Sequence, residues 1–405
     1  MRKIDLTNFN VASSETARDI NRRIVLDLIR TRQPISRADL ARLSGLHPST
    51  VSLITDQLTA DRWVIEGAFG HLPRGRKPRF LHLNVERAGI IGVNVRSSVT
   101  KIGLANLDAR FIFQESFATP PNFEDFTRAL TERLLALIKQ HPEMLFAGIG
   151  ISLPGRVDPA SKRLILAPNL GWRDVDLRAP IEEATGFSVE VENVANACAL
   201  AHLWFQNKTD GISDLTAVTI SEGIGTGIII NGQLVRGAHG MAGEFGHTSL
   251  NQDGTQCKCG KKGCWEVYAS NTAAVNQYAA SILSDRSKKK DNGADVPPPS
   301  FDDILRLAEQ GDVKAAAALD NMAYFVGSGL AALITGIAPE MIVLIGEITQ
   351  AWERAGPIIK NVLEERLSEP LKKTPIVPIE ASAEPRLRGS VALILQRHFG
   401  ISLVA

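Results

Sequence analysis

The sequence has no long apolar run and only four cysteines among its 405 residues. No stretch approaches the ~18 consecutive apolar residues that a membrane-spanning helix needs, so we expect no transmembrane segment and no membrane partner. The N-terminal segment MRKIDLTNFNVASSET also lacks the apolar core of a signal peptide. We therefore expect a cytoplasmic protein, and its length allows two or three domains with a sizeable core.

The chain also lacks a strong overall charge, because its formal net charge is +1. The near balance hides an uneven distribution, since residues 1–83 carry 14 Lys and Arg against 8 Asp and Glu, whereas the remainder carries 31 against 36. A basic N-terminal segment on an acidic body indicates one part that meets a polyanion and one that does not. Chance scatter of surface charge is the alternative.

The basic segment has the pattern of a helix-turn-helix. NRRIVLDLIRTR (21–32) carries a helical apolar stripe and stops before Pro34. In ISRADLARLSGL, Ser36 is expected to cap the second helix and Gly45 to close its turn. The third helix, HPSTVSLITDQLTADRW, has Pro48 in its first turn. The apolar positions of the second and third helices expected to face inward are Leu40, Leu43, Val51, Ile54 and Leu58.

Two features of this segment are expected to contact DNA. The short donors and acceptors near the start of the third helix, able to approach base edges in the major groove, are Ser49, Thr50 and Ser52. The next stretch, VIEGAFGHLPRGRKPRFLHLN, predicts a winged hairpin with the tip PRGRKPR. Arg74, Arg76 and Lys77 make that tip cationic and suited to a narrow A·T-rich minor groove. A solvated basic loop that binds phosphates without preference is the alternative.

From residue 89 onward, strands alternate with helices, which is typical of α/β layers. GIIGVNVRSSVTKIGLANL predicts two strands joined by a turn, and MLFAGIGISLPG and FSVEVEN predict two more. A second set begins with the hairpin LTAVTISEGIGTGIIINGQLV and ends with MIVLIGE. Two such sets predict paired lobes around a cleft. Residues 284–300, SDRSKKKDNGADVPPPS, have no apolar period and predict a surface loop with a solvated charge run.

Three of the four cysteines lie close together in CKCGKKGC. Cys257, Cys259 and Cys264 fall within eight positions, and His247 lies ten positions before the first of them. Three thiolates and one imidazole make a closed tetrahedral site, most consistent with structural Zn²⁺. Disulfide pairing is the alternative, but three cysteines cannot pair evenly and a cytoplasmic protein is reduced. Cys198 is expected to be a small buried residue outside the site.

These motifs together resemble a known family. GEFGHT followed by CKCGKKGCWE resembles the signature of the ROK family (repressors, open reading frames, sugar kinases). SLPGRVD, APNLGW, VENVANACAL and TISEGIGTG resemble its other blocks in the same order, so the resemblance covers nearly the whole chain. The N-terminal winged helix is what distinguishes the repressor branch of the family.

The resemblance implies an α/β fold of the actin-like (ribonuclease H-like) sugar-kinase type, in which a zinc loop supports the sugar-binding loop. We expect a winged helix-turn-helix domain over 1–83 and a first lobe over 84–201. We expect a second lobe with the zinc loop over 202–382. The last helix, within 383–405, is expected to return to the first lobe.

The resemblance also places sugar contacts on six residues of this chain. They are Gly155, Asn169, Asn193, Glu244, His247 and Glu266. Carboxylates and amides suit a ring rich in hydroxyls, because they accept and donate paired hydrogen bonds. His247 would have two roles, with one ring nitrogen on zinc and the other toward a sugar hydroxyl. For Glu244 and Glu266, support of the zinc loop alone is the alternative.

The chain departs from the family's kinases at the positions that carry the chemistry. Those kinases resemble E-N-D-A-N where this chain has Val194, and their aspartate takes the proton of the attacking hydroxyl. Loss of a general base costs ~10²–10⁴ in rate. Where the kinases carry D-x-G-G-T, residues 94–98 read NVRSS, and Glu222 brings a negative charge to the second glycine loop. We therefore expect no catalytic residue and no use of ATP.

The sequence thus predicts a sugar-responsive transcriptional regulator, a repressor, whose kinase-like body senses a carbohydrate without phosphorylating it. Its expected partners are a double-stranded DNA operator and a small sugar or sugar derivative. Two-fold operators require a homodimer or homotetramer. A DNA-binding protein whose body serves only oligomerisation and an active ROK sugar kinase are the alternatives. The sequence does not identify the sugar. A pentose would lose no hydrogen bond at Val194, because it has no hydroxyl group at that point.

Overall fold

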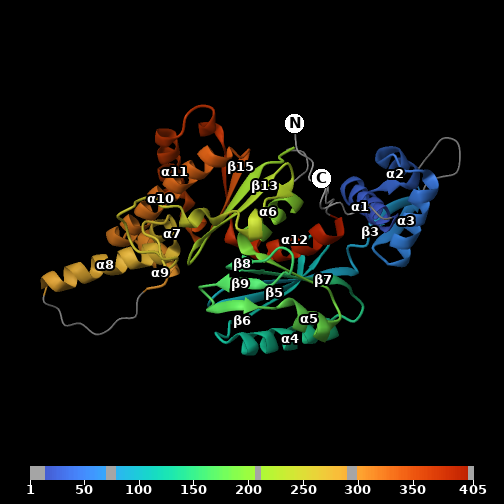
Figure 1. Ribbon diagram of the computed structural model, residues 1–405, viewed down its shortest axis with the longest axis horizontal. Coiled ribbons are helices and arrows are strands. Elements are labelled where there is room, and N and C mark those ends of the chain that lie inside the picture. The colour runs from blue at the N-terminus through green and yellow to red at the C-terminus, as the bar shows by residue number, and fades with distance from the viewer. Residues whose placement is uncertain (1–13, 70–78, 206–210, 290–298, 400–405) are drawn as a thin grey trace.

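The computed structural model describes residues 14–69, 79–205, 211–289 and 299–399 (Figure 1). The N-terminal unit consists of three helices and a small sheet in the order β1-β3-β2. Its helices are α1 (Ser14–Arg32), α2 (Arg37–Ser44) and α3 (Pro48–Ala60). Its strands are β1 (Ile35–Ser36), β2 (Val64–Phe69) and β3 (Arg79–Leu83). The predicted helix-turn-helix and the two strands of the wing are therefore confirmed.

The capping residues of the second helix act as the sequence predicts. The Ser36 side chain accepts a hydrogen bond from the Asp39 backbone N–H at 3.2 Å, and Gly45 ends α2 with a φ of 71°. One predicted core position is wrong, because Leu43 is 50% exposed whereas Leu40 is fully buried. Leu43 lies in the last turn of an eight-residue helix, beside the cap where the chain reverses, so the helix ends before this side chain is covered.

The first lobe is built on a five-stranded sheet in the order β11-β7-β4-β5-β6. Its strands are β4 (Ala88–Val95), β5 (Val99–Asn106), β6 (Phe111–Ala118), β7 (Leu145–Leu153) and β11 (Val189–Asn193). The first three are antiparallel neighbours, whereas β4, β7 and β11 run parallel. Helices α4 (Phe123–Gln140) and α5 (Arg178–Thr185) lie on one face (Figure 1). All eight residues of β4 are buried, as expected for a strand covered on both faces.

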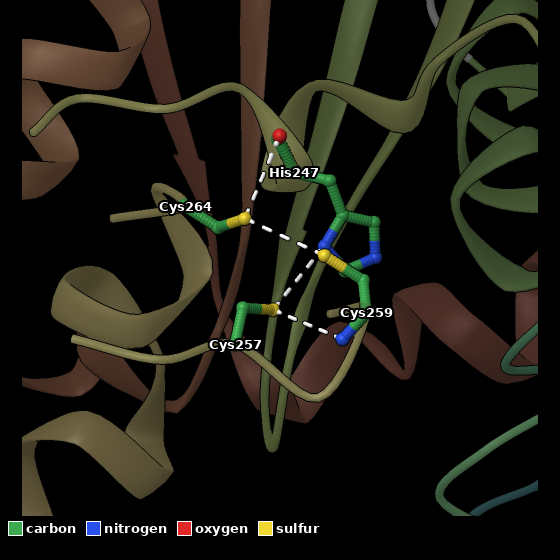
Figure 2. Close-up of side chains that lie close together, drawn as sticks. All are labelled: His247, Cys257, Cys259 and Cys264. Carbon is green, nitrogen blue, oxygen red and sulfur yellow. Dashed lines mark hydrogen bonds between the residues drawn. The ribbon is translucent and has the colours of Figure 1, made fainter. Parts of the chain in front are cut away.

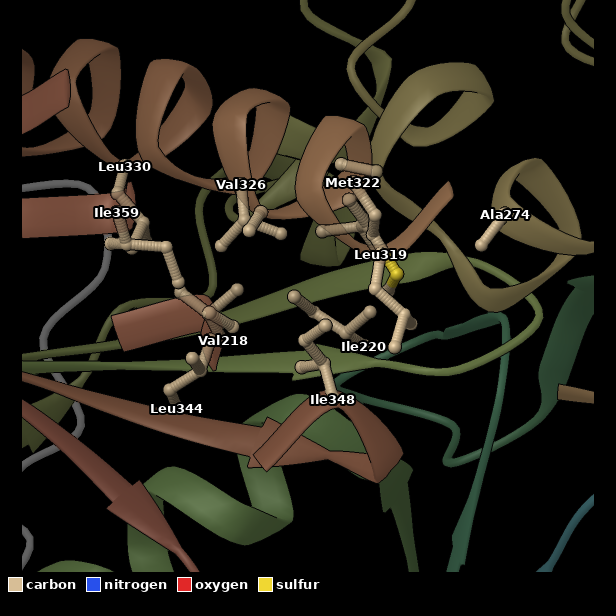
Figure 3. Close-up of a cluster of buried hydrophobic side chains, with 14 of the residues drawn as sticks. Val218, Ile220, Ala274, Leu319, Met322, Val326, Leu330, Leu344, Ile348 and Ile359 are labelled. Carbon is tan, nitrogen blue, oxygen red and sulfur yellow. The ribbon is translucent and has the colours of Figure 1, made fainter. Parts of the chain in front are cut away.

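The second lobe repeats this topology in the order β14-β13-β12-β15-β16. Its strands are β12 (Leu215–Ile220), β13 (Ile224–Ile230), β14 (Gln233–Leu234), β15 (Met341–Gly346) and β16 (Ile376–Ile379). Its long helices are α8 (Asn271–Lys289), α9 (Phe301–Glu309), α10 (Val313–Ile337) and α11 (Trp352–Arg366). Figure 3 shows the core, where Leu319 and Met322 of α10 face Ile220 of β12. The expectation of two lobes with repeated α/β sets is confirmed.

Two helices lie between the sheets and join the lobes (Figure 1). Helix α6 (Val194–Phe205) leaves the first sheet yet packs on the second, and α12 (Pro385–Phe399) leaves the second yet packs on the first. The Ser390 hydroxyl of α12 donates to the Val93 carbonyl of β4 at 2.8 Å. The two helices touch where Gly389 lies against Ala197, since an added Cβ would approach the Ala197 carbonyl carbon to 2.9 Å. Movement of one helix therefore affects the other.

The remaining elements are short. A small sheet consists of β8 (Arg156–Val157), β9 (Leu164–Ala167) and β10 (Trp172–Val175). The short helices are η1 (Ala238–Gly240), η2 (Glu244–His247), α7 (Glu266–Ala269), η3 (Glu347–Ala351), η4 (Leu371–Lys373) and η5 (Ala381–Ala383).

Two long helices bear on predictions from the sequence. The loop predicted from residue 284 is wrong over 284–289, because α8 continues to Lys289, and 290–298 lie outside the described residues. A charged sequence without an apolar stripe can still extend a helix that is already anchored. In the described part of the chain, α10 is long and apolar enough to cross a membrane, but 67% of its apolar window is buried. It serves as the core helix of the second lobe.

Candidate functional site

The predicted metal ligands come together in one cluster (Figure 2). The ligand atoms of His247, Cys257, Cys259 and Cys264 all lie within 4.8 Å of one another. His247 Nδ1 lies 3.6 Å from Cys257 Sγ, and the sulfurs of Cys259 and Cys264 are 3.6 Å apart. The edges of a tetrahedron around Zn²⁺ with Zn–S bonds of about 2.3 Å measure about 3.8 Å. The group therefore has the size and the donor set of a closed metal site.

Two further features of the cluster concern metal binding. Burial together with the neighbouring thiols of Cys259 and Cys257 raises the pKa of Cys264 to about 12. Metal binding replaces such thiol protons, which is the usual coupling between a thiolate site and its metal. Gly263 makes the tight loop possible, because its φ is 66° and an added Cβ would collide with the Asn251 carbonyl. The fourth cysteine, Cys198, is buried on α6 outside the cluster, as predicted.

The turn between β11 and α6 presents the first predicted sugar contact. Asn193 ends β11, and its side-chain oxygen accepts from the Ala195 backbone N–H at 2.8 Å. Its amide nitrogen donates to the Gly155 carbonyl at 2.7 Å, which joins two of the six predicted residues. Val194 is the first residue of α6 and is half-buried, packed against the apolar cluster between α6 and the second sheet. No proton can be taken up by this side chain.

Two further predicted residues meet at the glycine loop between β12 and β13. Glu266 Oε2 accepts from the Ile224 backbone N–H at 3.0 Å. An added Cβ on Gly223 would collide with that carboxylate and lie 3.8 Å from Asn169 Nδ2, so these groups surround one small space. Asn169 belongs to the segment after β9, and an added Cβ on Gly155 would lie 2.8 Å from the nearby Ala167. The structure thus links the residues of both lobes.

The last two predicted residues belong to η2. Glu244 and His247 are three positions apart, and His247 Nε2 lies 3.9 Å from Glu244 Oε2. Since Nδ1 faces the sulfurs, Nε2 points to the carboxylate, and a metal on Nδ1 would fix this tautomer. Gly246 packs on the start of β13, because an added Cβ would collide with the Ile224 carbonyl. The segment that carries His247 and the Glu266 side chain therefore meet at the same residue of β13, Ile224.

The region that resembles the phosphate-binding part of ROK kinases contains ion pairs. Arg96, at the end of β4, reaches across to Glu347 at 2.9 Å and to Glu222 at 3.5 Å. Arg386 of α12 donates to Glu347 at 3.0 Å. Ser97 also donates to Glu222 at 3.3 Å. The two segments singled out from the sequence are thus brought together, but by side-chain contacts between the lobes that the sequence did not predict.

Glu347 is the centre of this network. Its side chain is 14% exposed, and its Oε2 accepts from Asn271 Nδ2 at 2.9 Å. Burial raises the pKa of Glu347, but the positive charges of Arg386 and Arg96 outweigh it and lower the pKa to about 2. Asn94, the amide in place of a carboxylate, is buried and donates to Ser152 Oγ at 2.9 Å. Glu347 and the Asn94 amide nitrogen thus find their partners within the protein, whereas the buried Arg96 Nε and Asn271 Oδ1 have no hydrogen-bond partner among the described residues.

The candidate DNA-reading surface lies on α3. Ser49 is exposed, and Thr50 and Ser52 are partly exposed, near the N-terminal end of this helix. The structure adds Leu53, which is 51% exposed one helical turn after Ser49. The sequence could have indicated Leu53, because it lies four positions after Ser49 and so on the same face of the helix. It was overlooked because a leucine is usually assigned to the core. The predicted wing-tip residues Arg74, Arg76 and Lys77 lie outside the described residues.

The N-terminal unit packs on the two helices that join the lobes (Figure 1). The guanidinium of Arg30 on α1 lies over the ring of Trp204 on α6. Trp63, just before β2, packs edge-on against Phe399 of α12, with ring centroids 5.9 Å apart. The apolar core of the unit is continuous with that of α12 and β4. The DNA-reading unit therefore rests directly on α6 and α12.

Known proteins are similar to this chain over nearly its full length. The xylose repressor of Bacillus subtilis (strain 168) is 31% identical over 362 residues, 89% of this chain and 89% of that protein. The crystal structure of a ROK family transcriptional regulator, a homolog of the E. coli MLC protein, superposes with a TM-score of 0.81 at 25% identity, covering 95% of this chain and 98% of that one.

Sugar kinases match the two lobes. A ROK family glucokinase from Streptomyces griseus, solved in complex with glucose and AMPPNP, has a TM-score of 0.65 at 28% identity and covers 76% of this chain and 99% of that one. The lobes thus have the actin-like sugar-kinase fold expected from the sequence. A profile of the ROK family matches residues 90–397. The chain therefore belongs to the ROK family.

Proposed function

We propose that this protein is a sugar-responsive transcriptional repressor whose kinase-like body binds a sugar and does not phosphorylate it. Two links between predicted sugar contacts support this function, from Asn193 to Gly155 and from Glu266 to Asn169 at Gly223. The helix-turn-helix that packs on the helices between the lobes also supports it. The xylose repressor relative supports it as well. Because its partner is chromosomal DNA, we place the protein in the cytoplasm.

The proposed sugar site comprises the six residues predicted from the sequence. Gly155 and Asn169 come from the segments beside the small sheet, and Asn193 from the β11–α6 turn. Glu244, His247 and Glu266 come from the zinc loop and its neighbour α7. Their amides, carboxylates and imidazole can exchange paired hydrogen bonds with ring hydroxyls. A closed Cys₃His site holding Zn²⁺ would fix this loop and orient His247.

The nature of the ligand follows from Val194. A hexose presents a hydroxymethyl group that a pentose lacks, and an apolar side chain offers that group no hydrogen bond. The B. subtilis relative is named for xylose, a pentose. We therefore propose a pentose, with xylose as the first candidate.

Kinase activity is absent in this proposal. Val194 leaves no general base at the start of α6, and Glu222 and Glu347 put carboxylates where phosphates of a nucleotide would approach. Both carboxylates are paired with Arg96, so a nucleotide phosphate would have to break these ion pairs to bind here. Because a ROK glucokinase is among the relatives, an active sugar kinase is the alternative function. A direct assay of sugar-dependent ATP turnover tests it.

DNA binding is assigned to the N-terminal unit. Ser49, Thr50 and Ser52 are proposed to contact base edges, with Leu53 against a thymine methyl group. Arg74, Arg76 and Lys77 are proposed to enter the minor groove. A homodimer or homotetramer would present two such units to half-sites ~34 Å apart.

The proposed domains are 1–83 for the winged helix and 84–201 with 383–405 for the first lobe. The second lobe is proposed to span 202–382. The limit at 201 falls within α6, whose body packs on the second sheet.

A paired titration tests this function. Operator fragments are titrated with the protein in the presence and absence of xylose, glucose and N-acetylglucosamine, and sugar binding is followed separately by thermal shift. We expect xylose to raise the melting temperature and to weaken operator binding at least tenfold. If no sugar of the panel stabilises the protein while it still binds the operator, the body serves only for oligomerisation, which is the ligand-independent alternative.

A further inference from the structure

A pocket of about 230 Å³ lies where the N-terminal unit meets both lobes. Its wall contains Arg23 of α1, Lys162 between β8 and β9, Arg236 after β14, and Arg397 of α12. Three parts of the protein thus contribute cationic side chains to one small space. This pocket is separate from the sugar site, since none of the six proposed sugar contacts lines it.

The charge of the pocket wall is positive. Four cationic side chains face two carboxylates, those of Glu190 and Glu192, so the wall has an excess of two positive charges. Glu190 pairs with Arg397 at 2.8 Å and with Lys162 at 3.6 Å. Glu192 pairs with Arg236 at 3.2 Å. The carboxylates hold the cationic groups in place and leave a field that favours an anion of charge two.

The Glu192 carboxylate is built into the fold. Glu192 is 6% exposed, and its Oε1 accepts from the Asn193 backbone N–H at 2.9 Å and from Asn196 Nδ2 at 3.1 Å. Its Oε2 is left to hold Arg236 at the pocket. Because this guanidinium is positioned before any ligand arrives, binding there costs less side-chain entropy than at a mobile surface arginine.

We propose that this pocket binds a small dianion of the phosphate class, either the free ion or a phosphate ester. Guanidinium and ammonium groups are the usual partners of phosphate oxygens. A neutral sugar brings no charge to this cationic wall, which separates the two sites by chemistry as well as by place.

The pocket and the sugar site share their supporting residues. Asn193 follows Glu192 on β11 and contacts Gly155 at the sugar site. The Arg236 carbonyl accepts from the Ala242 backbone N–H at 3.0 Å, on the segment that leads to η2. A dianion bound to Arg23 would also tie α1 to both lobes. We infer that it alters the response of DNA binding to sugar, and this regulatory step rests on the proposed function.

The binding step is tested on the full-length protein without DNA or sugar. Inorganic phosphate and ribose 5-phosphate are titrated at pH 7.5, with KCl at the same ionic strength as reference, and the melting temperature and calorimetric heat are recorded. Lys162→Gln and Arg397→Gln remove pocket cations, and Arg306→Gln on the distant helix α9 is the matched control. We expect saturable binding of at least one of the two phosphates, weakened tenfold or more in both pocket variants and unchanged in Arg306→Gln.

Two results would overturn the site: stabilisation by KCl equal to that by both phosphates, or phosphate affinity that is the same in the folded pocket variants and in Arg306→Gln. Comparison of the two ligands distinguishes a free ion from an ester, and binding of either that depends on Lys162 supports the site. If xylose releases the operator but no phosphate binds, only this inference fails. If phosphate binds and no sugar acts, the pocket stands and the proposed function fails.

Discussion

The guanidinium of Arg30 lies 4.5 Å from the centroid of the Trp204 ring, so the N-terminal unit rests on the C-terminal end of α6. The same helix begins at Val194, directly after Asn193 at the proposed sugar site. Trp204 Nε1 also donates to Gln396 Oε1 of α12 at 2.9 Å. One twelve-residue helix therefore contacts the proposed sugar site at one end and the DNA-reading unit at the other. A packed helix moves as a rigid body, so a shift at its first turn is transmitted to its last.

Replacement of Trp204 by alanine should uncouple sugar binding from DNA release. The cation–π contact between Arg30 and Trp204 contributes about 0.5–2 kcal/mol. Its loss removes this packing contact between α1 and α6. We expect Trp204→Ala to bind sugar with an affinity within about threefold of wild type. Its operator affinity should change less than half as much on sugar addition. Paired thermal-shift and DNA titrations measure both quantities.

Trp204→Phe is the matched variant, because it keeps an aromatic face under Arg30 but loses the hydrogen bond to Gln396. It should retain most of the sugar response. A full response in Trp204→Ala would show that α6 does not carry the coupling.

Loss of one proposed zinc ligand should remove the metal and loosen the sugar loop. Cys264→Ser leaves two thiols and the imidazole, so metal affinity should fall and the protein as purified should contain much less than one zinc per chain. Its melting temperature should fall by several degrees, and sugar binding should weaken with it because His247 loses its anchor. Metal content is measured by plasma mass spectrometry and stability by calorimetry. Cys198→Ala is the control, since Cys198 lies outside the cluster, and it should keep its zinc.

The sequence alone predicted those parts of the structure that local patterns determine. Apolar periods and capping residues such as Ser36 and Gly45 predicted the helix-turn-helix, because those signals act within a few residues. The cysteine spacing predicted the cluster of His247 with the three cysteines for the same reason. Leu43 was predicted wrongly because its exposure depends on where α2 ends relative to its neighbours, which a helical period does not contain.

Contacts between residues far apart in the sequence could not be predicted from the sequence alone. Arg96 and Glu347 are 251 positions apart, and only the three-dimensional placement of the two lobes shows that they pair. The pocket at Arg23 likewise requires the placement of three separate units. The small sheet β8-β9-β10 was missed because its strands have only two to four residues, too short for an alternating pattern to be recognised.

Acidification should destabilise the protein through His202 on α6. Burial lowers the pKa of His202 to about 4, and within the described residues its Nε2 has no hydrogen-bond partner. The unfolded chain, with a pKa of about 6.5, therefore takes up a proton first as the pH falls. Above pH ~6.5 His202 is neutral in both states and does not lower the free energy of unfolding. As the pH falls from ~6.5 toward ~4, protonation of the unfolded chain lowers that free energy progressively.

The corresponding variant is His202→Gln, which does not titrate. Relative to wild type it should gain on the order of 2 kcal/mol in free energy of unfolding between pH 7 and pH 4.5, allowing for partial exposure of the ring. Urea denaturation at both pH values measures the difference. A difference that does not change with pH would contradict the shifted pKa.

Removal of a wing-tip cation should weaken operator binding without affecting the body. Arg76→Ala is expected to lower operator affinity about tenfold at physiological salt and to reduce the slope of log affinity against log salt by about 1. Arg306→Ala, on the second lobe, is the matched control. Fluorescence anisotropy at several salt concentrations gives both numbers, and an unchanged slope would remove Arg76 from the DNA interface.

Restoration of the missing base should not restore a kinase. Val194→Asp places a carboxylate at the first residue of α6, beside Asn193, where the resemblance to ROK kinases implies an aspartate. The phosphate region remains closed to nucleotide, because Arg96 stays paired with Glu347 and Glu222 keeps its negative charge there. We expect no sugar-dependent ATP turnover above background in a coupled assay.

The new carboxylate can accept a hydrogen bond from a hexose hydroxymethyl group, so the ratio of glucose to xylose affinity should rise about tenfold. Val194→Asn is the control, since it can bind that hydroxyl but cannot act as a base. Equal sugar affinities in wild type and both variants would place Val194 away from the sugar, and ATP turnover in Val194→Asp would show that only the base had been lost.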